Sequence, residues 1–282
     1  MIRTSSSRCP RSTRGEREVL GGVYRNWRRQ RILRQSGLDD ALWEETVRHF
    51  PFAWTLEADD RRRLRELVAL FLHEKSFSAT HGIALTHAMQ VWVAVQACIL
   101  VLNLGLDYYK GWRGVILYPE QFVPRHQHVD EIGVVHETGD PHMGEAWLGG
   151  PVVLSWADIQ TSEYPDGVNV VIHEFAHKLD MLNGDANGFP PLHPGMSRDA
   201  WSKAWSAAYG DFCARVDAGE DTLIDPYASE SPGEFFAVLS EAFFETPEIV
   251  QDEYPAVYGQ LATFYRQDPA RRFALASARL PG

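Results

Sequence analysis

The sequence is poor in cysteine. Its 282 residues contain only Cys9, Cys98 and Cys213, which are too few and too far apart for a disulfide framework. No Cys-x-x-Cys pair occurs either. Isolated thiols of this kind are typical of reducing compartments, so we expect a cytoplasmic protein.

Positive charge and long apolar segments are also scarce. The formal net charge is -11, which argues against binding of nucleic acid through the whole surface. The longest run without a charged residue or a histidine, 88–106, approaches the length of a membrane span. Because Gln90, Gln96 and Asn103 interrupt it, we interpret it as a buried helix and expect no membrane span.

Arginine is concentrated at the amino end. Residues 1–36 contain ten Arg and two acidic residues, a charge of about +8, so the remaining 17 basic and 36 acidic residues carry about -19. This composition predicts a basic, disordered tail over 1–36, followed by a single domain over 37–282. A transit peptide, or contact of the tail with an anionic partner or membrane surface, remains an alternative.

Apolar periodicity changes twice along the chain. Short Val- and Ile-rich segments in the middle favour strands, and amphipathic or apolar segments on both sides favour helices. The sequence therefore predicts an α+β fold that is mostly helical and has a small mixed sheet. The expected helices are 38–50, 57–75, 83–104, 168–183, 198–217, 233–246 and 254–267, and the expected strands are 112–119, 129–137 and 149–156.

One helix carries an HExxH motif. Within VNVVIHEFAHKLDMLNG, His173 and His177 are four residues apart, so their imidazoles share one face and can reach the same zinc ion. Glu174 is then placed to accept a proton from the metal-activated water that attacks a carbonyl. The alternative is a core helix with hydrogen-bonded histidines, although burying such residues without a metal or partner is costly.

The third metal ligand is left open by the spacing. Asp180 stands where the close HExxHxxGxxH pattern has Gly, and it could orient an imidazole or pair with a basic side chain. The downstream helix offers Glu234 and Glu241, two turns apart on one face. Glu234 also fits a capping box with Ser231, which needs no metal.

Several segments together resemble a known family. VVIHEFAHKLDMLNG, IDPYASESPGEFFAVLSEAFFE, AVQACILVLNLGLDYY and GGPVVLSW are similar to the Mlc titration factor A family of zinc peptidases. In that family, and in the related catalytic domain of anthrax lethal factor, a Tyr precedes the third ligand by seven residues. The resemblance implies one zinc ion held by His173, His177 and Glu234. It also implies Glu174 as general base and Tyr227 as donor to the oxyanion.

The resemblance also implies a fold and a function. The fold is that of a zincin, and Glu241 becomes a candidate partner for a ligand histidine. The function is an aminopeptidase-like zinc peptidase that acts on peptide or protein substrates and is linked to sugar uptake through a Mlc-like transcriptional repressor. Alternatives are a binding protein that sequesters the repressor, with catalysis latent, and a metal-stabilised structural domain. GGPVVLSW is either an edge strand for an extended peptide or a core strand.

Overall fold

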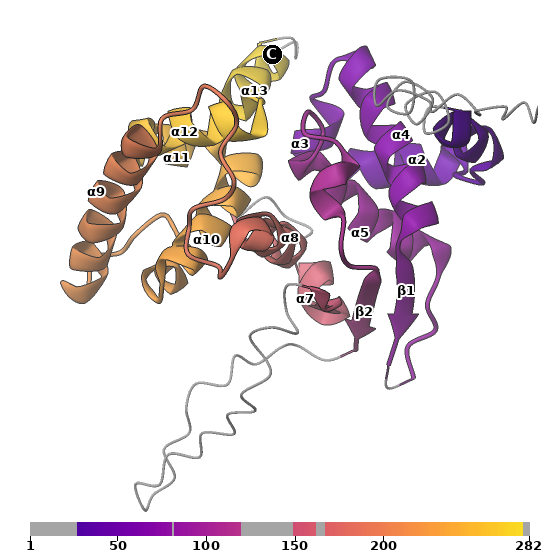
Figure 1. Ribbon diagram of the computed structural model, residues 1–282, viewed down its shortest axis with the longest axis horizontal. Coiled ribbons are helices and arrows are strands. Elements are labelled where there is room, and N and C mark those ends of the chain that lie inside the picture. Colours follow the sequence, from indigo (N-terminus) through magenta and orange to yellow (C-terminus); the bar gives the residue numbers. More distant parts are fainter. Residues whose placement is uncertain (1–26, 81, 120–148, 162–166, 279–282) are drawn as a thin grey trace, which may run out of the picture. The chain divides into compact units, whose positions relative to one another are not determined.

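The computed structural model describes residues 27–80, 82–119, 149–161 and 167–278 (Figure 1). The chain divides into two units, residues 1–37 and 38–282. The described part of the first unit contains a helix over 27–35, in which the Arg31 guanidinium lies 5.7 Å from the centre of the Trp27 ring. The predicted strand 129–137 lies outside the described residues, and the division into tail and domain stays a prediction.

Four helices open the second unit. They are α2 (Asp40–Arg48), α3 (Pro51–Trp54), α4 (Ala58–Glu74) and α5 (His87–Leu100). The Asp39 side chain caps α2 by accepting the Leu42 N–H, and Pro51 begins a short helix of its own after α2 ends. α5 is buried along most of its length, in agreement with the interpretation of its apolar run. None of the described helices is long and apolar enough to cross a membrane.

The sheet has three described strands, β1 (Ser76–Ala79), β2 (Gly114–Tyr118) and β3 (Val152–Ser155), in the order β1-β2-β3. Both pairings are parallel, so across the described residues the expected mixed sheet is a parallel one. The sequence did not predict β1. Side chains alternate along β2, where Val115 and Leu117 face the core.

Helices dominate the rest of the unit, and prolines stand at the first turn of each helix after α9. Three of these α-helices, α7, α11 and α13, were not predicted, nor were the short 3-10 helices η1 and η3. The elements are η1 (Leu106–Tyr109), α7 (Trp156–Thr161), α8 (Val170–Asp180), η2 (Met181–Asn183), α9 (Arg198–Asp217), η3 (Pro226–Ser229), α10 (Pro232–Glu245), α11 (Pro247–Glu253), α12 (Pro255–Tyr265) and α13 (Pro269–Ser277).

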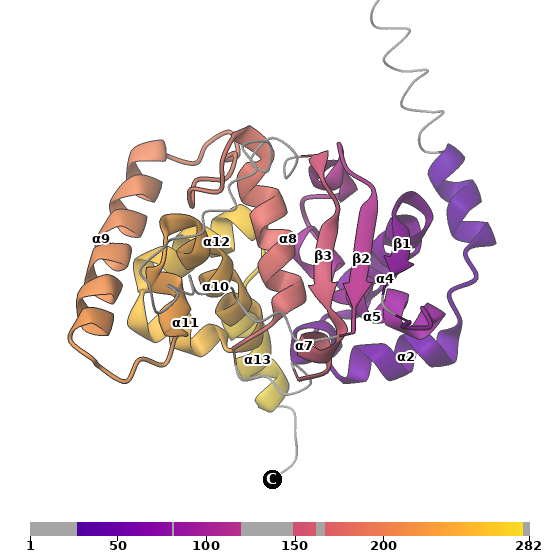
Figure 2. The same cartoon turned by 90° about the horizontal axis from the view of Figure 1, so that it is seen from below.

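The helix that carries the HExxH motif, α8, lies in the centre of the unit. It packs against α10 on one side and against α5 and β3 on the other (Figure 2). Val171, Ile172, Phe175 and Leu179 are fully buried in these contacts. The fold is therefore mostly helical with a small sheet, as predicted, and its core fixes α8 against α10.

Candidate metal centre

The amino end of α8 is set by a buried asparagine. Asn169 caps the helix, because its side-chain oxygen accepts the Ile172 N–H at 2.9 Å. The apolar side chains of α8 occupy the faces toward the core. This leaves the side chains of His173, Glu174 and His177 partly buried.

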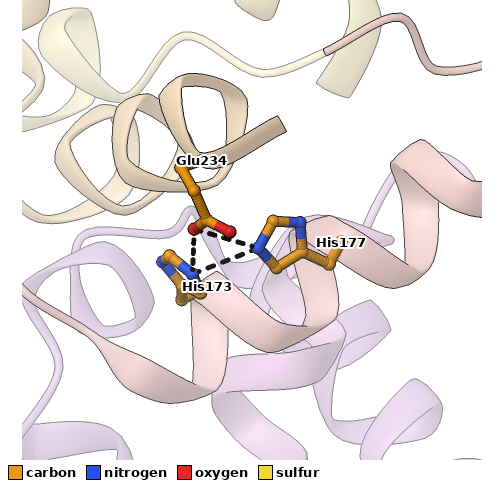
Figure 3. Close-up of side chains that lie close together, drawn as sticks. All are labelled: His173, His177 and Glu234. Atoms are coloured by element: carbon orange, nitrogen blue, oxygen red, sulfur yellow. Dashed lines mark hydrogen bonds and ion pairs between the residues drawn. The ribbon is translucent and has the colours of Figure 1, made fainter. Parts of the chain in front are cut away.

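Three potential ligand atoms converge between α8 and α10 (Figure 3). The Nε2 atoms of His173 and His177 are 3.2 Å apart. Glu234, in the first turn of α10, places Oε2 at 3.0 Å from the first nitrogen and 3.3 Å from the second. Within the part of the chain that the structure describes, no other three His, Cys, Asp or Glu side chains meet in this way.

These distances fit a tetrahedral metal ion. With bonds of about 2.0–2.1 Å, ligand atoms around tetrahedral zinc are separated by about 3.3 Å. The three separations of 3.0–3.3 Å are close to that value. Two imidazole nitrogens that face each other need a proton or a cation between them, and two nitrogens with one carboxylate oxygen are a common zinc donor set. The residues therefore fit a zinc ion.

The charges of the cluster are strongly coupled. Burial alone would raise the pKa of Glu234, but hydrogen bonds from His173 and His177 outweigh it and lower the pKa to about 2. Burial would lower the pKa of His173, yet the charge of Glu241 and hydrogen bonds with both glutamates raise it well above its ordinary value. Burial raises the pKa of Glu174, and the two imidazoles offset part of this. The site thus presents an ionised carboxylate to a positive charge.

Tyr227 lies at the border of the cluster, on η3. Asp225 fixes this short helix by accepting the Tyr227 backbone N–H at 2.9 Å. The Tyr227 ring centre is 6.1 Å from that of His173, and 41% of the residue is exposed. The Tyr227 ring therefore lies beside that of His173 and remains accessible from solvent.

Comparison with known proteins identifies the family. The family described as glucose-regulated metallo-peptidase M90 matches residues 24–266. The chain belongs to this family. Its relatives include a Mlc titration factor A of Klebsiella pneumoniae (strain 342), 39% identical over 84% of this chain and 90% of the relative. One from Salmonella arizonae is 37% identical over 87% of this chain and 97% of the relative. The resemblance is confirmed, and the protein is an M90 metallopeptidase.

Two buried glutamates on α10 support His173 and the start of α8. The Nδ1 atom of His173 is 2.7 Å from Glu241 Oε1, as expected for a partner of a ligand histidine. Glu241 also accepts the Asn169 backbone N–H, and the Asn169 side chain donates to Glu245 at 2.7 Å. Sequence reasoning missed Asn169 and Glu245. The signal available was an Asn directly before an apolar helix, and a second Glu one turn after Glu241.

Asp180 contacts the loop that follows α8 in this M90 enzyme. Its Oδ2 accepts the Gly188 backbone N–H at 2.7 Å, whereas the sequence suggested an imidazole or a basic side chain as partner. The residue is fully buried, and burial raises its pKa. Asp180 therefore connects the end of α8 to the loop, and the charge of His177 offsets part of the effect of burial on its pKa.

Proposed function

We propose that this M90 metallopeptidase is an aminopeptidase-like zinc enzyme with one zinc ion per chain, held by His173, His177 and Glu234. The convergence of their ligand atoms, 3.0–3.3 Å apart, supports this assignment most directly. A bound zinc ion would activate a water molecule and polarise the scissile carbonyl. Among the residues that the structure describes, no other group of three His, Cys, Asp or Glu side chains could hold it.

Two further side chains carry the chemistry. Glu174 lies close enough to His173, His177 and Glu234 for their charges to affect its pKa. We assign it as the general base, which takes the proton of the attacking water and delivers it to the leaving amine. Tyr227 donates its phenolic O–H to the oxygen on which negative charge develops, because its ring borders the cluster.

The cell location and the extent of the catalytic unit belong to the same proposal. Cys98 and Cys213 are free thiols, which supports a reducing, cytoplasmic setting. Residues 37–282 form the peptidase domain, and 1–36 form a basic tail outside it.

A regulatory role is the second candidate function. The relatives are named Mlc titration factor A, and the family description includes glucose regulation. These names support binding of a Mlc-like transcriptional repressor by this chain, with catalysis either separate or latent. A pure binding role does not require Glu174, so a substitution at this residue distinguishes the two functions.

The experiment measures zinc content and peptide hydrolysis for the wild type, Glu174→Gln and Glu234→Ala. We expect about one zinc per chain in the wild type and in Glu174→Gln, hydrolysis only in the wild type, and weakened zinc binding in Glu234→Ala. Substrates with free and with blocked amino ends test the aminopeptidase assignment. Zinc without hydrolysis would favour the repressor-binding role, and absence of zinc would overturn the metal site.

A further inference from the structure

The loop over 184–189 touches the first turn of α10, the helix that carries Glu234. A Cβ atom added at Gly188 would lie 2.6 Å from the carbonyl oxygen of Pro232. One added at Gly233 would lie 2.7 Å from the carbonyl oxygen of Ala186. Both obstacles are backbone atoms, which cannot move aside as a flexible side chain can. The two backbones therefore meet at two points where only glycine fits.

Two buried side chains hold Gly188 in place. Its N–H donates to Asp180 Oδ2 at 2.7 Å, and its carbonyl accepts the indole N–H of Trp201 at 3.0 Å. Asp180 and Trp201 are both fully buried. Gly188 also has φ +74°, which a side chain would strain. The loop is thus attached to the end of α8 and to α9, and it has little freedom to move away from α10.

This arrangement links the two ligand-bearing helices outside the metal centre. Asp180 follows His177 by three residues, and Gly233 immediately precedes Glu234. A displacement of the first turn of α10 is therefore carried directly to the Glu234 side chain. Metal ligands tolerate errors of only about 0.2–0.5 Å before affinity falls.

We propose that Asp180, Gly188 and Gly233 are positioning residues for the metal ligand Glu234. Together they form a spacer that sets the distance between the start of α10 and the two histidines of α8. The inference rests on the proposed function, because it assumes that His173, His177 and Glu234 hold the metal.

The first test replaces each glycine by alanine. Gly233→Ala is paired with Gly210→Ala, a helical position where an added Cβ meets nothing within 4 Å. Gly188→Ala is paired with Gly219→Ala, which has φ +73° and equally open surroundings. Zinc affinity is measured by competition with a chromophoric chelator, and ligand geometry by the visible spectrum of the cobalt(II)-loaded protein. We expect affinity at least about tenfold weaker and an altered spectrum in Gly233→Ala and Gly188→Ala, but not in the controls.

The second test uses Asp180 and does not depend on a steric clash. Asp180→Ala removes the acceptor of the Gly188 N–H, whereas Asp180→Asn retains a side-chain oxygen that can accept it. We expect weaker zinc binding in Asp180→Ala and recovery of most of the affinity in Asp180→Asn. A purely structural role would lower the thermal stability of Asp180→Ala without this difference in zinc binding.

The outcomes separate the two proposals. Wild-type zinc affinity and a wild-type cobalt spectrum in folded Gly233→Ala or Asp180→Ala would overturn the positioning role alone. If the glycine variants do not fold, the comparison of Asp180→Ala with Asp180→Asn decides the question. A wild-type protein that binds no zinc would overturn both the metal site and this inference.

Discussion

The side chains of the metal centre differ in how far local sequence determines them. His173 and His177 share a face because they are four residues apart on one helix, so the sequence alone predicts their proximity. Glu234 lies 57 residues after His177, and spacing could not distinguish it from Glu241. The structure shows the difference, since Glu234 contacts both Nε2 atoms and Glu241 contacts Nδ1 of His173.

Tyr227 provides a prediction at the scale of a single hydroxyl. Tyr227→Phe should lower kcat by about 100-fold, because it removes a donor to the developing negative charge. Zinc affinity should stay at the wild-type value, since Tyr227 is not among the three proposed ligands. Steady-state kinetics and chelator competition measure the two quantities.

The matched control for this change is Tyr258→Phe. Tyr258 lies on α12, and its hydroxyl donates to Asp268 at 2.7 Å. The change also removes a hydroxyl, and it should leave kcat unchanged. Equal kcat values for Tyr227→Phe and the wild type would show that the phenol takes no part in the reaction.

At the scale of elements, the site depends on α8 and α10 running antiparallel. The cap of α8 meets the last turns of α10 through Asn169, while the loop after α8 meets the first turn of α10 through Gly188. The two helices are thus connected near both ends. Asn169 donates two hydrogen bonds to α10, and its side-chain oxygen accepts a third from the first turn of α8.

Asn169→Ala should lower the free energy of unfolding by about 2.5–4 kcal/mol. Loss of an N-cap costs about 1 kcal/mol, and loss of a buried hydrogen bond to a charged group costs about 1.5–3 kcal/mol. Asn169→Asp keeps a capping oxygen but places a second carboxylate against Glu245, so it should cost more than the loss of this hydrogen bond alone. Urea unfolding of the metal-free protein measures the change.

The comparison for Asn169 is Ser197→Ala, at the exposed N-cap of α9. The Ser197 side chain accepts the Ala200 N–H at 3.2 Å and, among the described residues, makes no bond like that of Asn169 to Glu245. Loss of this cap should lower the free energy of unfolding by about 1 kcal/mol. If both alanine variants lost the same stability, the bond to Glu245 would contribute nothing.

The elements that the sequence predicted are those whose signal is local. α9 was predicted with its observed bounds, and α4 within one residue at each end, because both begin at clear capping or acidic residues. β1 was missed because SFSA has no Val or Ile, and it becomes a strand only by pairing with β2. Strand direction was likewise not predictable, since it depends on pairings between distant segments.

For the whole molecule, removal of zinc should lower thermal stability. An ion that binds only the folded state at 100 times its Kd adds about 2.7 kcal/mol, which corresponds to about 5–10 °C in Tm for a unit of this size. Calorimetry with zinc and with a chelator measures the shift. Glu234→Ala should show little difference between the two conditions, and an equal Tm for both forms of the wild type would contradict zinc binding to the folded state.

Lys75 gives the whole molecule a dependence on pH that does not involve the metal centre. Its ammonium donates to the Trp112 carbonyl at 2.8 Å, yet burial lowers its pKa from 10.5 to about 8. Between these values the unfolded chain binds more protons, so stability should rise with pH, by about 2 kcal/mol after allowance for solvent screening. Burial raises the pKa values of Cys98 and Tyr109, which makes stability fall with pH. Both residues are present in the wild type and in Lys75→Met. The difference between the two proteins in urea unfolding therefore isolates the contribution of Lys75. A difference in the free energy of unfolding between wild type and Lys75→Met that stays constant from pH 7 to pH 10.5 would contradict the lowered pKa of Lys75.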